Sequence, residues 1–269
     1  MYSLPTEPGS IGHTLDAGFK LYFVSFKQVL VLSILAALSV AVPMLAVVLA
    51  VPMFAGDDQG PGNAFIAVFV IGILVAISLY LWFYIAAVCR IGGIAYGQNL
   101  SLGACLSTGL RRLIPVILAS FLYGLAMMGG MILFIIPGMI LWLSLAFYAL
   151  CIVLEGDGIL ESLRHSHRLV WGNWWRTAII GSVVLIVYYV IYLAIEIPFA
   201  VVDQVLFETE PGDLPGFAQA MLSMLGSTLS TVITFPLMTS VFVAVFHDLK
   251  LRKEGYDLEA RVEALTASA

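Results

Sequence analysis

Charged residues are scarce in this sequence. Lys, Arg, Asp and Glu make up 11% of the 269 residues, whereas soluble globular domains carry roughly 25%. Hydrophobic residues make up 61%, and they are gathered into long runs. A soluble core of this size does not hide so much apolar surface. The composition therefore excludes a soluble globular domain and predicts a membrane protein.

Cysteine and clustered basic residues are also scarce. The three cysteines, Cys89, Cys105 and Cys151, are odd in number and follow no motif spacing, so no disulfide framework is expected. The twelve Lys and Arg residues are spread thinly, so we expect no nucleic-acid partner.

The N-terminal MYSLPTEPGS has no basic region and no apolar core, so we expect no cleaved signal peptide.

Catalytic motifs are absent. The sequence has no HExxH, no GxSxG, no P-loop and no paired intramembrane carboxylates. We therefore expect a non-enzymatic protein without catalytic residues and without a cofactor. His165 and His167 are two residues apart and point to different faces of a helix, and no histidine or cysteine has ligand spacing, so no metal site is expected either.

Six apolar runs are long enough to cross a bilayer, because about 20 helical residues span a hydrocarbon core of about 30 Å. The predicted spans are 29–54, 65–89, 114–135, 139–154, 177–207 and 217–246. A short turn at Ile136-Pro137-Gly138 joins the third span to the fourth, and acidic turns fill 55–64 and 208–216. The expected fold is an all-α integral membrane protein with six transmembrane helices in three hairpins.

The longest polar island is GDGILESLRHSHRLVWGNWWR, residues 156–176. Asp157 is placed to cap a helix and Gly172 to end it. Ile159, Leu160, Leu163 and Val170 share one side of that helix, and Glu161, Arg164, His165 and Arg168 share the other. The pattern predicts an amphipathic helix on the membrane surface, followed by an anchor of Trp174, Trp175 and Arg176 where the chain enters the bilayer.

Similar amphipathic segments precede the other two hairpins. Ser10 and Ser101 are placed to cap them. Three six-residue segments share a leucine, a small residue and a base at equal offsets: Leu15/Gly18/Lys20, Leu106/Gly109/Arg111 and Leu163/Ser166/Arg168. We expect one polytopic domain of three units, 10–90, 101–155 and 157–247, each an interfacial helix plus a hairpin, with a tail at 248–269. The alternative is likeness by composition alone.

All twelve basic residues fall on one face of this layout: Lys20, Lys27, Arg90, Arg111, Arg112, Arg164, Arg168, Arg176, Lys250, Arg252, Lys253 and Arg261. The opposite turns carry only acids: Asp57, Asp58, Glu208, Glu210 and Asp213. By the positive-inside rule, we expect a multi-pass membrane protein with both termini in the cytoplasm.

Two groups of polar residues are candidate sites. Glu196, Ser227 and Thr231 form a candidate intramembrane polar site; Glu196 is either a buried functional carboxylate or a residue of the outer interface, and the hydroxyls serve either a substrate path or close helix packing. The candidate contacts to lipid headgroups are Arg111, Arg112, Arg164, Arg168 and Arg176. Plain determination of topology is the alternative role for these arginines.

Three pieces of the chain together resemble a known family. They are SLGACLSTGLRRLIPVIL (101–118), the proline–glycine turn with LEGDGILESLRHSHRLVWGNWWR after it, and LKLRKEGYDLE (249–259). The set resembles YciC-like bacterial inner-membrane proteins and the membrane domain that precedes some glycerophosphodiester phosphodiesterases. The resemblance implies a polytopic inner-membrane protein with a role in envelope or lipid homeostasis. It transfers no catalytic residue, because the phosphodiesterase chemistry resides in a separate soluble domain.

Three functions remain open at this point. The first is a lipid-binding protein of envelope or lipid homeostasis, with membrane phospholipids as partners. The second is a transporter or channel for a small solute, with a path past Glu196 or the Ser/Thr face of the sixth span. The third is a scaffold whose tail, Lys250 to Ala269, docks a cytoplasmic partner. A homo-oligomer or another membrane partner is compatible with all three.

Overall fold

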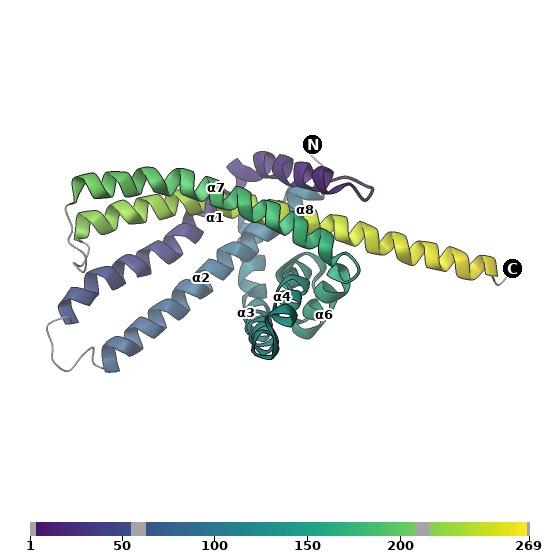
Figure 1. Ribbon diagram of the computed structural model, residues 1–269, viewed down its shortest axis with the longest axis horizontal. Coiled ribbons are helices and arrows are strands. Elements are labelled where there is room, and N and C mark those ends of the chain that lie inside the picture. The colour runs from purple at the N-terminus through teal and green to yellow at the C-terminus, as the bar shows by residue number, and fades with distance from the viewer. Residues whose placement is uncertain (1–3, 55–62, 208–215, 268–269) are drawn as a thin grey trace.

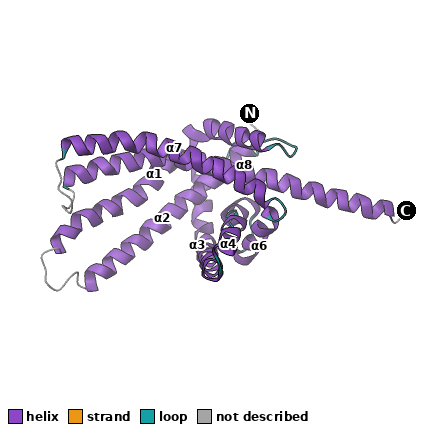
Figure 2. Cartoon of the chain, viewed as in Figure 1, coloured by secondary structure: helices purple, strands orange, loops and turns teal. Residues whose placement is uncertain are grey.

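The computed structural model describes residues 4–54, 63–207 and 216–267 (Figure 1). Figure 2 shows helices and connecting loops, and no strand occurs among the described residues. Six stretches are apolar and long enough to cross a membrane. The prediction of an all-α membrane protein is therefore confirmed. The acidic turns expected at 55–64 and 208–216 lie almost entirely outside the described residues.

Five of the six stretches are single helices, and the fourth is broken. In chain order the elements are α1 (Ile11–Phe54), α2 (Asn63–Ala95), α3 (Leu102–Leu133), α4 (Ile135–Ser144), α5 (Tyr148–Leu150), the π-helix η1 (Cys151–Glu155), α6 (Ile159–Val170), α7 (Trp174–Leu206) and α8 (Phe217–Ala267). The α8 helix continues through the residues expected to form a separate charged tail.

The long helices are arranged around α8. The most extensive helix contact is between α1 and α8, and α2 packs against both. Leu21, Val29, Ile91 and Phe246 are fully buried in this contact. In Figure 1, α2 and α7 and parts of α1 and α8 extend to the left, α8 continues in yellow to the far right, and α3, α4 and α6 form a group beneath. Large apolar side chains such as Ile132 (80% exposed) remain on the outside, as suits a surface that contacts lipid.

The predicted helix starts agree with the structure in two places and differ in one. Ser10 Oγ accepts from the backbone N–H of His13 (3.3 Å), and Ser101 Oγ accepts from that of Ala104 (3.2 Å). The prediction for Asp157 is wrong. The N-cap of α6 is Gly158, which has no side chain to accept a hydrogen bond, and the Asp157 carboxylate contacts His165 instead of capping the helix.

One of the three expected surface helices is a separate helix. α6 stands alone, but the segments after Ser10 and Ser101 are the first turns of α1 and α3. The expectation of separate helices is wrong at these two places, because the backbone continues as one helix from the amphipathic segment into the span, in α3 even through Pro115. α6 is also rotated from the expected orientation. Ser162, Ser166, Leu169 and Val170 are buried, whereas Leu160 is 59% exposed.

The three six-residue segments nevertheless occupy similar environments. The small residue, Gly18, Gly109 or Ser166, is buried in each segment, and the base that follows two residues later is exposed. A Cβ added at Gly18 would lie 3.0 Å from Cα of Val241, and one at Gly109 would lie 3.0 Å from the carbonyl oxygen of Trp82. The shared small residue thus marks a close contact with another part of the chain.

Ser166 is the partner of the break in the fourth span. Its hydroxyl donates to the carbonyl oxygen of Ser144 (2.8 Å) and accepts from the backbone N–H of Phe147 (3.1 Å). Backbone groups that leave a helix inside an apolar layer need such partners. The prediction of a continuous fourth helix is therefore wrong. The helix can break at this point because Ser166 of α6 supplies hydrogen bonds to the backbone groups that lose their helical partners.

Two glycines bring α3 and α4 together. A Cβ at Gly130 would lie 3.0 Å from Cα of Gly138, and a Cβ at Gly138 would lie 2.9 Å from the backbone nitrogen of Met131. Gly130 therefore allows close contact between α3 and α4. Adjacent Gly129 faces open space.

We expect Gly138→Ala to lower the free energy of unfolding by about 1–3 kcal/mol, because its methyl group meets backbone that cannot rotate away. Thermal unfolding in detergent, followed by circular dichroism, measures the change. Gly129→Ala is the matched control, and it should leave the midpoint unchanged or raise it, since alanine favours a helix over glycine. Equal midpoints for the two variants would contradict the close contact.

Candidate functional site

Two apolar grooves with cationic or aromatic rims border α4. The first, the α4–α6 groove, has a volume of about 920 Å³. It is lined by Leu141, Leu145, Leu160, Glu161, Leu163, Arg164, His167 and Arg168. Its apolar walls come from α4 and the exposed leucine side of α6, and its charged rim comes from the next turns of α6. An amphipathic molecule matches this division better than a wholly polar one.

The second groove, the tryptophan groove, lies between α4 and the start of α7 and has a volume of about 930 Å³. It is lined by Ile136, Met139, Ile140, Trp171, Gly172, Asn173, Trp174, Trp175 and Arg176. Trp175 is 76% exposed and Trp171 is 59% exposed. Gly172 adopts a φ of 96°, the left-handed conformation that turns the chain from α6 into α7.

The residues that line the tryptophan groove show that the α3–α4 hairpin runs across the bundle. In a layout of six parallel crossings, the turn at Ile136 would lie about 30 Å from Arg176, on the other side of the hydrocarbon core. In the structure both residues line one groove. Figure 1 likewise shows α3 running across the direction of α7. Hydropathy alone does not predict this direction.

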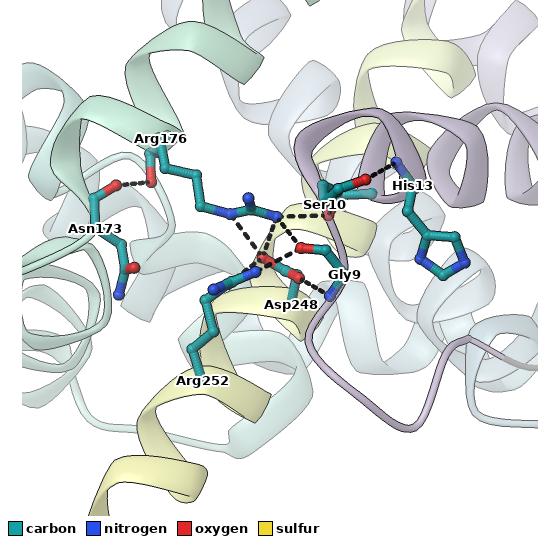
Figure 3. Close-up of polar contacts among 9 residues, drawn as sticks. Gly9, Ser10, His13, Asn173, Arg176, Asp248 and Arg252 are labelled. Carbon is teal, nitrogen blue, oxygen red and sulfur yellow. Dashed lines mark hydrogen bonds and ion pairs between the residues drawn. The ribbon is translucent and has the colours of Figure 1, made fainter.

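A buried ion network anchors the start of α7 beside this groove (Figure 3). Oδ2 of Asp248 accepts from Nε (3.1 Å) and Nη2 (3.0 Å) of Arg176 and from Nε of Arg252 (3.0 Å). The Asp248 side chain is only 8% exposed. Two guanidinium groups therefore share one largely desolvated carboxylate, which raises the strength of each interaction above that of a surface pair.

The same network holds the N-terminal segment. The backbone N–H of Gly9 donates to Oδ1 of Asp248 (3.1 Å), and the carbonyl oxygen of Gly9 accepts from Nη2 of both Arg176 and Arg252. Nη2 of Arg176 also donates to Oγ1 of Thr14 (3.0 Å). The residues before α1, the start of α7 and the middle of α8 are thus joined at one point (Figure 3).

The five candidate headgroup arginines have different surroundings. Arg164 and Arg168 are exposed on the rim of the α4–α6 groove. Arg176 lines the tryptophan groove, but its guanidinium is engaged by Asp248, Gly9 and Thr14. Arg112 directs Nη1 toward the carbonyl oxygen of Gly156 (3.5 Å), and Arg111 is exposed without lining either groove.

The candidate intramembrane residues are only partly brought together. Glu196 is half-buried and accepts from Ser230 Oγ (3.0 Å), a residue not singled out in the sequence. Ser227 is at the surface and donates to the carbonyl oxygen of Met224 (3.1 Å). Thr231 donates to the carbonyl oxygen of Ser227 (2.8 Å), so both hydroxyl protons are satisfied within α8.

Thr231 also lines a third cavity, here called the tyrosine cavity, with a volume of about 440 Å³. It is lined by Val40, Tyr80, Tyr84, Tyr188, Thr231, Thr234, Phe235, Met238, Thr239 and Phe242. Three tyrosines and three threonines are thus among its lining residues, and each threonine hydroxyl donates to a backbone carbonyl oxygen within α8. The tyrosines come from two separate spans, so their spacing in the sequence carries no signal of this cavity.

Asp248 is the important residue that the sequence reasoning missed. It lies at the boundary between the sixth apolar run and the charged segment, where an acid is unremarkable by composition. A signal does exist: Arg252 follows it by four residues, the spacing of neighbours on one helix face. The partnership with Arg176 is long-range and has no counterpart in local spacing.

We expect Asp248→Asn to lower the free energy of unfolding by about 2–4 kcal/mol, because it leaves two largely buried guanidinium groups without a counter-ion. Chemical unfolding of the detergent-solubilised protein, together with limited proteolysis of the segment before α1, measures the loss. Asp16→Asn is the control: it removes the exposed Asp16–Lys20 pair (2.7 Å) and should cost at most about 0.5 kcal/mol. Similar losses in both variants would show that the network contributes no more than a surface pair.

Comparison with known proteins places the chain in a family. No curated protein and no solved structure matches it. A family described as a domain of unknown function (DUF7847) matches residues 59–249. The match covers most of the chain and includes α3, α4, α6 and α7, which form both grooves beside α4. The protein therefore belongs to the DUF7847 family.

Proposed function

We propose that this protein is a non-enzymatic, multi-pass protein of the bacterial inner membrane that binds phospholipid beside α4. The observation that carries the proposal is the pair of grooves, each with an apolar wall of α4 and a rim from α6 or the start of α7. A phospholipid has the same division: acyl chains against the leucine and isoleucine walls, and an anionic headgroup at the arginine rim.

The exposed side chains of the rim support a lipid ligand. Leu160 and Trp175 are large apolar residues that remain exposed in the grooves. Arg164 and Arg168 are exposed one and two turns beyond Leu160 on α6. Cations near an anionic leaflet contribute about 1 kcal/mol each to lipid attraction. Tryptophan favours the level of the headgroups, where its ring is half in the apolar layer.

The same proposal fixes an orientation. Four basic residues of three helices, α3, α7 and α8, make contacts at one end of the molecule: Arg112 to the carbonyl oxygen of Gly156, Lys250 to Glu155, and Arg176 and Arg252 to Asp248. We infer that this end and both termini face the cytoplasm, in line with the positive-inside rule. The resemblance to YciC-like proteins supports a role in envelope or lipid homeostasis.

We expect the unmodified protein, extracted in mild detergent, to retain phospholipid in native mass spectrometry. The double variant Arg164→Glu/Arg168→Glu should weaken retention of anionic phospholipid by at least about tenfold, since two attractive charges are lost.

Lys20→Glu/Lys27→Glu is the matched control. It makes the same change in net charge on exposed residues of α1 that line neither groove, so retention should be nearly unchanged. The proposal fails if no phospholipid is retained or if both double variants lose it equally.

The tyrosine cavity favours a second candidate function, passage of a small polar solute. Six hydroxyl-bearing side chains line its 440 Å³ among the long helices. A solute path requires this space to be filled with water, whereas tight helix packing does not.

A solute path predicts that Thr231→Cys reacts with a water-soluble, membrane-impermeant maleimide in intact vesicles. Ile186→Cys, on an exposed apolar position of α7 (63%), should stay unreactive because lipid covers it. The three native cysteines are buried and contribute little background. An unreactive Thr231→Cys would remove the solute path and leave the lipid proposal in place.

A further inference from the structure

Three metal-binding side chain types meet where η1 turns into α6. The ligand atoms of Cys151, Asp157 and His165 all lie within 4.8 Å of one another. Nδ1 of His165 and Oδ2 of Asp157 are 2.6 Å apart. The spacing of these residues in the sequence matches no ligand motif, which is why no metal site was expected. The fold brings them together through a turn and a helix.

The backbone around the cluster is unusual. Cys151 opens η1, a π-helix, and π-helical turns are rare and frequent at functional sites. Gly156, with a φ of 83°, reverses the chain after η1. The backbone N–H of Asp157 then donates to the carbonyl oxygen of Cys151 (3.3 Å), which fixes the two residues against each other. His165 reaches the same point from the second turn of α6.

Asp157 contacts His165 of this cluster instead of capping α6. A carboxylate just before a helix usually accepts from the first backbone N–H groups. Gly158 occupies the N-cap of α6 and no side chain caps it, so the Asp157 carboxylate faces the imidazole instead. Neighbouring Glu155 is engaged by Nζ of Lys250 (2.9 Å) and does not join the cluster.

We propose that Cys151, Asp157 and His165 bind a transition-metal ion of the zinc class. Thiolate and imidazole suit zinc and its neighbours, whereas magnesium and calcium prefer oxygen ligands throughout. With metal–ligand distances of 2.0–2.3 Å, ligand atoms around a tetrahedral ion lie roughly 3.3–3.8 Å apart. The side chains therefore need shifts of about 1 Å to hold an ion in place of the hydrogen bond between His165 and Asp157.

The arrangement fits an ion better than a nucleophilic cysteine. Cys151 is fully buried, so its sulfur is closed to an attacking geometry on a substrate. The side chains of His165 and Asp157 are 22% and 15% exposed and leave an aqueous route for a small ion. Binding requires the thiol to release its proton to solvent, so uptake should weaken as the pH falls.

Titration of the detergent-solubilised, metal-stripped protein with Co²⁺ tests the site. We expect one equivalent to bind, with a thiolate-to-cobalt charge-transfer band in the near ultraviolet and competition by Zn²⁺. Cys151→Ser should abolish the band, and His165→Asn and Asp157→Asn should each weaken binding by about 10- to 100-fold or more, at least the loss seen on removing an outer-shell partner.

Cys105→Ser is the matched control, because Cys105 is also buried but lies in another cluster. It should keep the full band. Should Cys151→Ser fail to fold, the two variants at His165 and Asp157, which are partly exposed, still decide the matter. The proposal is overturned if the unmodified protein binds no Co²⁺, if the charge-transfer band survives in Cys151→Ser, or if neither His165→Asn nor Asp157→Asn weakens Co²⁺ binding.

Discussion

The interaction between Asp248 and two arginines holds this structure together at one end. The Asp248 carboxylate accepts hydrogen bonds from Arg176 of α7 and Arg252 of α8, and also from the backbone N–H of Gly9. Apolar helices in a bilayer gain little from the hydrophobic effect once inserted, so packing and polar contacts determine how they associate. The largely desolvated Asp248 carboxylate binds three chain segments directionally, and separating them would leave buried charges unpaired. It thereby defines where α7 starts relative to α8 and α1.

The break in the fourth span serves both the fold and the candidate site. Ser166 satisfies the backbone of Ser144 and Phe147, and this contact fixes α6 against the interrupted helix. With its small-residue face buried there, α6 presents Leu160 and Arg164 along α4. The same hydrogen bonds that stabilise an interrupted helix therefore create the walls and the rim of the α4–α6 groove.

The sequence predicts properties that depend on neighbouring residues and misses those that depend on direction. Apolar runs locate the six long stretches, and Ser10 and Ser101 locate two helix starts, because both signals are local. A hydropathy profile gives the position and length of each apolar stretch but not the direction of its helix. It therefore does not show that α3 and α4 run across the bundle. Helical spacing predicts that Arg164 and Arg168 lie on the same exposed side of α6. The contact between Arg176 and Asp248 joins residues 72 positions apart, so local spacing does not predict it.

The length of α8 has a mechanical consequence. This helix has 51 residues, which corresponds to about 75 Å, and it carries both Ser230, the partner of Glu196, and Asp248, the partner of Arg176. Pro236 lies between these two contacts and removes one backbone hydrogen bond of the helix, so α8 bends most easily there. The C-terminal extension is therefore coupled more closely to the contact between Asp248 and Arg176 than to the contact between Ser230 and Glu196, which lies beyond the proline.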